Sequence, residues 1–540
     1  MIDRRGTLAL GALGGLAAAV PPVAAAGQQG TGQRGRGIEG QRQADLGNGT
    51  FLNPILAGDF ADPSILKDGE DYYLTHSSFE ASPGLLIWHS RDLVNWTPIA
   101  TALAKPLGTV FAVDLVKHNG RYFIYIPFMA APWSEGFKSF ANIFVIHADD
   151  IRGPWSDPID LGIGNLIDPG HVVGEDGKRY LFLSGVSRVA LTDDGLATAG
   201  PVEPAYAGWK YPDEWIVEAY SLEGPKLFRR GGYFYLVTAV GGTGGPPTGH
   251  MVAVARSRSV HGPWQDCPHN PIVHTRADTE RWLSRGHATM LEGPAMLEGP
   301  GDWWMVYHGY ENGYRTLGRQ TLLEPLGWTR DGWPRALGGD LSRPIGKPRG
   351  GVAGPHGIAW SDNFATFALG TRWRFYNQPP RENGRAAIGG GALVLQAKGT
   401  GPHDGSPLTH PVGDHGYECT VSVELEDGAQ AGLLLFFNDR LFLGMGYDGA
   451  KMTSYRGGKA SYWPEPVAAA RTIDLRIVND RNIVTMYYRT PGTGWIRHGV
   501  RSEVSGYNAN TIDDLASLRP ALFASGKGRA RFRNYTYRAI

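Results

Sequence analysis

Five segments of the chain share one pattern of apolar and polar positions. In each, two bulky apolar residues, usually aromatic, stand side by side and begin a short apolar run, while turn-forming polar residues separate the segments. The segments start at Tyr72, Tyr122, Tyr180, Tyr233 and Trp303, so the intervals are 50, 58, 53 and 70 residues. A repeat of this length built from strands predicts a radial arrangement, with one blade of a β-propeller for each segment.

A second element recurs in phase with the first. An apolar strand leads into a polar turn that a tryptophan closes, at 87–96, 145–155 and 254–264. The fifth copy carries Leu326-Gly327-Trp328 instead, and the third lacks the tryptophan. Helical periodicity is nearly absent from this part of the chain, so we expect a five-bladed propeller over residues 51–345.

Beyond a Gly- and Pro-rich linker near residue 350, apolar and polar residues alternate more regularly. The alternation is clear at 417–425, 473–478, 483–488 and 530–537. A period of two is typical of half-buried strands, so residues 355–540 are predicted to form a C-terminal β-sandwich of the jelly-roll, concanavalin-like type. The predicted fold class is therefore all-β.

The N-terminus has the pattern of an export signal. Arg4-Arg5 precedes an apolar run over about 7–20, and small residues end at Ala26. The adjacent arginines favour twin-arginine export, with an ordinary Sec signal as the alternative. We interpret 1–26 as the signal and the Gly-, Gln- and Arg-rich stretch 27–50 as a flexible linker, which predicts a periplasmic or extracellular bacterial protein.

Composition excludes several classes of function. Lys plus Arg and Asp plus Glu are equal at 52 each, so no net field favours nucleic acid or an anionic membrane. No later segment is apolar enough to insert into a membrane, and the two cysteines form no metal-binding motif. The glycine run 241–245 leads into two prolines and a strand, which indicates a hairpin loop and not a phosphate site.

A polar residue stands just upstream of each aromatic segment. In chain order these residues are Asp62, Asp114, Asp168, Glu223 and His287. If each lies on or before the innermost strand of its blade, the side chains meet in one central cavity. Clustered carboxyl groups push their pKa values apart, so one can stay protonated while another is ionised, as glycosidic-bond hydrolysis requires.

The same residues lie in motifs that resemble glycoside hydrolase family 43, in particular its β-xylosidase and α-L-arabinofuranosidase members. The motifs are Gly58-Asp59-Phe60-Ala61-Asp62-Pro63-Ser64, Ala112-Val113-Asp114-Leu115, Leu222-Glu223-Gly224-Pro225, Arg285-Gly286-His287-Ala288 and Leu317-Gly318-Arg319-Gln320. The resemblance covers nearly everything after residue 51, and the C-terminal sandwich is similar to the accessory domain of those enzymes.

The resemblance implies a role for each catalytic candidate. Asp62 would be the general base that activates water, Glu223 the general acid, and Asp114 the residue that tunes and orients the acid. Asp168 is interpreted as structural or as an axial-cavity residue, and Asp59 as a turn residue beside the site.

The resemblance also implies three substrate-binding residues. Phe79 would form an apolar wall under the sugar, while His287 and Arg319 would lie at the cavity floor. In such enzymes the counterpart of His287 often faces a hydrated cation, commonly calcium, near the propeller axis. No cofactor is expected to be required for the reaction.

The predicted function is inverting, exo-acting hydrolysis that releases xylose (as a β-1,4-xylosidase), L-arabinose or both from xylan- or arabinan-derived oligosaccharides of plant cell walls. Three alternatives stay open: an α-L-arabinofuranosidase only, a fructan or sucrose hydrolase, and a non-catalytic glycan-binding propeller. The motifs Asn-Asp-Pro and Arg-Asp-Pro of fructan hydrolases do not occur. Ala81 stands where the family usually has an aromatic residue, which leaves xylose against arabinose open. The sandwich is either a carbohydrate-binding module or a packing partner that shapes the rim of the site.

Overall fold

The computed structural model describes residues 35–540 except 138, 296–300, 427 and 463. The predicted export signal, 1–26, and the first part of the predicted linker lie outside the described residues. Within the part of the chain that is described, no helix is long and apolar enough to cross a membrane.

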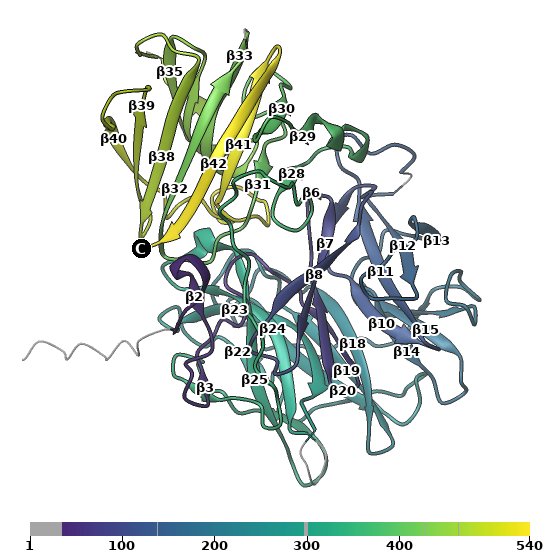
Figure 1. The fold of residues 1–540 in the computed structure, drawn as a ribbon. Helices are drawn as coiled ribbons and strands as arrows, with labels where there is room; N and C mark the ends of the chain where they lie inside the picture. Colours follow the sequence, from purple (N-terminus) through teal and green to yellow (C-terminus); the bar gives the residue numbers. More distant parts are fainter. Residues whose placement is uncertain (1–34, 138, 296–300, 427, 463) are drawn as a thin grey trace, which may run out of the picture. The chain divides into compact units, whose positions relative to one another are not determined.

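Residues 64–336 form five antiparallel sheets that follow one another along the chain, so the predicted five-bladed propeller is confirmed (Figure 1). The first blade contains β4 (Ser64–Asp68), β5 (Asp71–Thr75), β7 (Gly84–Ser90) and β8 (Thr97–Leu103). The second contains β9 (Thr109–Val110), β10 (Asp114–His118), β11 (Arg121–Met129), β12 (Ala141–Ala148) and β13 (Ile159–Gly164). The third contains β14 (Gly170–Val173), β15 (Arg179–Leu183), η2 (Ser184–Val186), β16 (Ser187–Leu191) and β17 (Glu203–Pro204).

The fourth blade contains β18 (Leu222–Arg230), β19 (Tyr233–Val240), β20 (Met251–Ser257), β21 (Gln265–Asp266) and β22 (Val273–His274). The fifth contains β23 (Trp282–Glu292), β24 (Trp303–Glu311), η3 (Arg315–Leu317), β25 (Arg319–Trp328) and β26 (Pro334–Ala336). The aromatic segments of the sequence are the second main strand of each blade, and they pack into the cores between sheets. The repeated tryptophans close turns, because Trp96 Nε1 donates to the carbonyl of Leu93 at 2.9 Å and Trp155 Nε1 to that of Ile151 at 3.2 Å.

The segment before β4 closes the propeller ring against the fifth blade. The Ile55 amide donates to the carbonyl of Thr321 at 2.9 Å, and the Asn53 side chain bonds both the amide and the carbonyl of Leu323. A short pair of strands, β3 (Thr50–Phe51) and β27 (Ile345–Gly346), adds to this closure. The two ends of the propeller chain are thereby held together, which fixes the inner strands around one axis.

Residues 35–50 are ordered, although the sequence predicted a flexible linker through residue 50. They form β1 (Gly35–Arg36), η1 (Ile38–Gly40) and β2 (Arg42–Gln43). The Glu39 carboxylate accepts the amides of Trp360 and Ser361 at 2.8 Å each, and Arg42 donates to Glu311 at 2.7 Å. The polar composition of this segment suggested flexibility. Its charged residues Glu39 and Arg42, however, bond partners more than 260 positions away in the sequence.

The C-terminal part is a sandwich of two antiparallel sheets, as predicted. One sheet contains β28 (Arg374–Tyr376), β31 (Leu408–Thr409), β33 (Ala429–Asn438), β34 (Leu441–Tyr447), β35 (Lys451–Arg456), β36 (Lys459–Ala460), β37 (Glu465–Pro466) and β41 (Arg519–Gly526). The other contains β29 (Ala386–Ile388), β30 (Leu393–Gln396), β32 (Gly416–Leu425), β38 (Thr472–Asp480), β39 (Ile483–Arg489), β40 (Ile496–Glu503) and β42 (Arg529–Ala539), and η4 (Pro380–Arg385) precedes β29. Strict alternation of burial along β32 and β38 gives this second sheet one apolar inner face.

One strand of the sandwich comes from the propeller part of the chain. β6 (Ala81–Ser82), in the loop between β5 and β7, pairs with β28 at the edge of the larger sheet (Figure 1). The Asn377 amide also donates to the carbonyl of Glu80 at 2.8 Å. The loop that carries Phe79 is therefore fixed by backbone hydrogen bonds to the sandwich.

Candidate active site

Asp62 lies in the turn before β4, and both oxygens of its carboxylate are bonded. Its backbone is in the left-handed region, with φ at 56°, and its side chain is buried. Oδ1 accepts Arg319 Nη1 at 3.1 Å, and Oδ2 accepts the Ser77 hydroxyl at 2.5 Å. A non-glycine residue held at positive φ is strained, and such strain concentrates at functional sites.

The charge environment keeps Asp62 ionised. Burial alone raises the pKa of this carboxyl, but the positive charge of Arg319, together with contacts from the His287 and His308 rings, outweighs burial and holds the pKa well below its usual value. The ring nitrogens of His308 and His287 lie 3.1 and 3.4 Å from Oδ1. Asp62 is therefore a carboxylate at any pH near neutrality, which a general base requires.

Arg319 is the first residue of β25 and contacts Asp62, Asp59 and the Phe79 ring. Burial opposes its charge, but the carboxylates of Asp62 and Asp59 raise the pKa of its guanidinium. The guanidinium carbon lies 5.3 Å from the centroid of the Phe79 ring, and Asp59 Oδ1 accepts the Arg319 amide at 3.2 Å. Nη2 is buried and bonds no described residue, so one donor of the fork is left for another partner.

Phe79 forms a wall beside this guanidinium. Its backbone exchanges two hydrogen bonds with Val110, at 2.8 and 3.0 Å, and its ring packs edge-on against Phe111 with centroids 5.7 Å apart. The ring is only 8% exposed. Phe79 and Arg319 thus lie together, as the sequence predicted for two substrate-binding residues.

Glu223 lies at the start of β18, where a bulge interrupts the pairing with β19. Its side chain is 23% exposed, and Oε1 lies 3.5 Å from His250 Nε2. Burial raises the pKa of this carboxyl, but contacts with His250 and His287 outweigh burial and lower it. Glu223 is more exposed than Asp62 or Asp168, so it is the carboxyl that a ligand reaches from solvent.

Asp168, and not Asp114, is the carboxyl that acts on Glu223. Asp168 lies before β14 with φ at 57°, and its Oδ2 accepts the amide of Gly224 at 3.0 Å. Burial and the neighbouring charges of Glu223 and Asp62 raise the pKa of Asp168 well above its usual value. Two carboxyl groups that repel each other in a buried site share one proton.

Asp114 begins β10 and is bound in a different way. Its Oδ1 accepts Lys226 Nζ at 2.7 Å and the Ser64 hydroxyl at 3.2 Å, and its Oδ2 accepts the His171 amide at 2.7 Å. The side chains of this pair are 9% and 6% exposed. The structure therefore places Asp114 in a buried ion pair, away from the tuning role that the resemblance implied.

Three histidines connect Asp62 with Glu223. His308 Nε2 lies 3.2 Å from His250 Nδ1, and His250 lies beside Glu223. His287 has φ at 61° and packs under Gly224, where an added Cβ would lie 3.0 Å from the ring. Burial lowers the pKa of His287 to about 4 and that of His308 well below its usual value, so both rings are neutral. The two catalytic candidates are thus separated by imidazole rings.

A cavity of about 420 Å³ opens beside Glu223. The glycine-rich loop at 242–245 forms one side, and residues of the sandwich between 509 and 515 form another. Asn510 Nδ2 donates to the carbonyl of Gly245 at 3.3 Å, which connects the two sides. The sandwich therefore shapes the rim of the site, one of the two roles that the sequence left open for it.

His250 and His308 were not predicted as site residues from the sequence, and Asp168 was interpreted as structural or as an axial-cavity residue. A signal for Asp168 was present, because Asp168-Pro169 repeats the dipeptide Asp62-Pro63. His250 lies five residues after the glycine run 241–245 and His308 lies inside the fifth aromatic segment, where both resemble ordinary strand residues. The contribution of residues 509–515 depends on domain packing and has no local signal.

The expected calcium ion finds no direct ligand set. Among the described residues, no group of three or more His, Cys, Asp or Glu side chains could hold a metal. Near the axis, His287 Nε2 is buried and has no partner within the described part of the chain. One imidazole nitrogen does not supply the six to eight oxygen ligands that calcium takes, so the ion would keep its hydration shell there and stays a prediction.

The centre of this propeller combines an ionised carboxylate, a carboxyl pair that shares a proton, and an arginine beside an aromatic ring, an arrangement that can carry out glycosidic-bond hydrolysis. Residues 51–334 match Glycosyl hydrolases family 43. The chain belongs to this family.

Relatives and solved structures agree with this classification. The chain is 34% identical over 309 residues to the non-reducing end alpha-L-arabinofuranosidase BoGH43B of Bacteroides ovatus, covering 54% of each protein. It is 31% identical over 328 residues to a xylan 1,3-beta-xylosidase of a Vibrio species, covering 53% of this chain and 57% of that protein. These matches span about half the length of the two relatives. The crystal structure of the GH43 protein BlXynB from Bacillus licheniformis superposes with a TM-score of 0.79 at 26% identity, over 91% of this chain and 100% of that chain.

Proposed function

We propose that this protein is an inverting, exo-acting glycosidase that removes xylose, L-arabinose or both from the non-reducing ends of xylan- or arabinan-derived oligosaccharides. The observation that carries the proposal is the contrast between the two carboxyl environments of the central cavity. Asp62 is held as a carboxylate, whereas the pair Asp168 and Glu223 retains a proton. A general base must be ionised and a general acid must be protonated, so the two environments match these two roles.

In this proposal Asp62 takes a proton from a water that attacks the anomeric carbon. Arg319 and Ser77 hold the carboxylate in place, and the Arg319 guanidinium has a donor left to bond a sugar hydroxyl. Phe79 packs against the apolar face of the ring. The chain of imidazoles from Asp62 to Glu223 shows that the two carboxyl groups are not in direct contact, and inversion requires such a separation so that a water can enter between acid and base.

Glu223 protonates the leaving oxygen as the glycosidic bond breaks. Burial and the charge of Glu223 raise the pKa of Asp168 well above its usual value, so the carboxyl pair retains one proton. Asp168 therefore takes the tuning role that the resemblance gave to Asp114. After the sugar leaves, Asp62 carries a proton and Glu223 has lost one, and exchange with solvent restores both.

A comparison of leaving groups tests these roles. Glu223→Ala should lose orders of magnitude in kcat with an alkyl or sugar leaving group, but far less with a dinitrophenyl pentoside, which departs without protonation. Asp62→Ala should be inactive with both, since no group activates water. Equal losses for Glu223→Ala with both leaving groups would contradict its assignment as the acid.

The sugar is proposed from the relatives, whose names include both an arabinofuranosidase and a xylosidase. A panel of aryl β-xylosides and α-L-arabinofuranosides, read for kcat/KM, decides between them. A non-catalytic glycan-binding propeller predicts binding of these compounds without any release of the aryl group. We also propose that the protein is exported and needs no cofactor, which secretion assays and activity after exhaustive chelation would test.

A further inference from the structure

A second cavity, of about 520 Å³, lies on the second blade and shares no lining residue with the cavity beside Glu223. Its walls come from the segment before β9, the loop between β11 and β12, and η4 at the start of the sandwich. The volume falls within the range of small-molecule sites, about 300–1,000 Å³. Nothing in the proposed mechanism uses this cavity.

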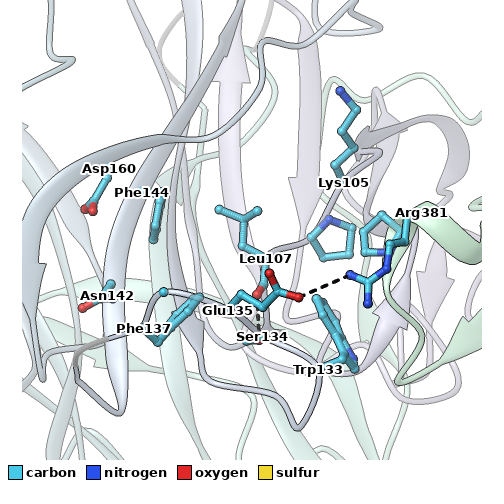
Figure 2. A pocket seen from close by; sticks show the side chains of 13 residues that line it. Lys105, Leu107, Trp133, Ser134, Glu135, Phe137, Asn142, Phe144, Asp160 and Arg381 are labelled. Atoms are coloured by element: carbon cyan, nitrogen blue, oxygen red, sulfur yellow. Dashed lines mark hydrogen bonds and ion pairs between the residues drawn. The ribbon is translucent and has the colours of Figure 1, made fainter.

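The walls of the cavity are aromatic and held in place. Figure 2 shows Phe137 and Phe144 on one side, Trp133 on the other, and Leu107 between them. Trp133 Nε1 donates to Asn377 Oδ1 at 2.7 Å, which fixes the indole, and the Phe144 ring packs on Phe128 with centroids 5.3 Å apart. Fixed aromatic faces lose little entropy when a flat, partly apolar ligand packs on them.

The rim of the cavity is polar and carries no net charge. Lys105 and Arg381 oppose Glu135 and Asp160, and Arg381 lies 4.0 Å from Glu135 across the opening (Figure 2). A balanced rim gives neither anions nor cations an electrostatic advantage. Its side chains instead offer donors and acceptors to the hydroxyl groups of a neutral ligand.

We propose that this cavity is a second glycan-binding site, which holds pentose units of a neutral xylan chain away from the point of cleavage. A pyranose ring has apolar C–H faces and hydroxyls at its edge, which matches apolar walls under a polar rim. The inference rests on the proposed substrate class.

The second cavity and the Phe79 loop of the catalytic site are connected along the chain. Leu107 lines the second cavity, while Val110, three residues later, pairs with Phe79 of the catalytic site. The Ser134 hydroxyl donates to the carbonyl of Leu107 at 2.8 Å and connects this segment to the aromatic loop. A polysaccharide held in the cavity is thereby kept close to the catalytic site.

The test uses the full chain with Asp62→Asn, which should bind glycans without turnover. Isothermal titration with xylohexaose should give two sites. Adding Trp133→Ala should weaken one of them about tenfold or more, and Trp133→Phe, which keeps a ring but loses the bond to Asn377, should restore part of the affinity. Phe140→Ala is the matched control, because Phe140 lies in the same loop and is 53% exposed but does not line the cavity.

Kinetics separate this inference from the proposed function. In the otherwise unchanged enzyme, Trp133→Ala should leave kcat/KM for an aryl pentoside unchanged and raise KM for polymeric xylan. A protein that cleaves aryl pentosides but binds xylohexaose at a single site, with or without Trp133, would overturn the second site alone. A protein that cleaves no glycoside would overturn the proposed function, and loss of both titration sites in Trp133→Ala, without recovery in Trp133→Phe, would contradict separate cavities.

Discussion

The ion pair between Lys226 and Asp114 should be a structural connection between blades. Lys226 Nζ, on β18, donates to Asp114 Oδ1 at 2.7 Å and to the carbonyls of Val113 at 2.7 Å and Pro169 at 3.0 Å. One ammonium group therefore joins the inner ends of the second, third and fourth blades. Because both side chains are nearly buried, removing one partner leaves the other charge poorly solvated.

The expected loss of folding stability depends on which hydrogen bonds remain in each variant. Breaking a buried ion pair costs about 3–5 kcal/mol. In Lys226→Met the Asp114 carboxylate keeps the His171 amide and the Ser64 hydroxyl, so we expect the lower end, about 3 kcal/mol. Asp114→Asn should cost a similar amount, and the double variant Lys226→Met with Asp114→Asn should cost less than the sum of the two.

The assay is urea unfolding followed by tryptophan fluorescence, together with kcat for the folded protein at low temperature. The folded Asp114→Asn enzyme should keep most of its kcat and the pH profile of the parent. Asp168→Asn is the matched control, because it removes a carboxylate from the neighbouring blade. Normal stability of Asp114→Asn combined with a displaced pH profile would refute this reasoning and return the tuning role to Asp114.

Three further outcomes are expected. Asp168→Asn should move the alkaline limb of kcat/KM to lower pH, since the carboxyl pair loses the member whose raised pKa lets the pair keep a proton; an unmoved limb would contradict this. Arg319→Met should move the acidic limb to higher pH, because Asp62 loses the cation that keeps its pKa low; a pH–rate series checks it. Burial and the charge of Asp514 raise the pKa of Glu80 to about 7 in the folded protein. The fold therefore favours the protonated carboxyl, so the stability that Glu80 contributes is complete below pH about 4.5 and is lost as the pH rises through 7. Glu80→Gln should therefore flatten the decline of Tm over that interval, and a slope identical to that of the parent would argue against it.

The repeated features of this chain could be predicted because they are local. Paired aromatic residues identified the second main strand of each blade, and alternation identified the sandwich, since each pattern follows from which face of a strand is buried. Asp62 and Glu223 were found because acids at the start of inner strands converge on one axis. Phe79 and Arg319 came from the resemblance, and the structure brings them together.

The features that were missed depend on partners far away in the sequence. Asp114 on an apolar strand suggested catalysis, but Lys226, 112 residues later, neutralises it. Asp168 gains its significance only from the fold, which brings it to the amide of Gly224. The pairing of β6 with β28 likewise joins residues nearly 300 positions apart, and no local pattern specifies such a contact.

Central to this account is that Asp62 activates water directly while Glu223 protonates the leaving oxygen. Proton NMR during the first turnovers of a β-linked xylo-oligosaccharide, or of an α-L-arabinofuranoside if that is the better substrate, reports the anomer that forms first. The account predicts the inverted anomer, followed by slow mutarotation. Initial formation of the retained anomer would mean that a carboxylate attacks the sugar itself, and it would contradict the assignment of Asp62 as a base.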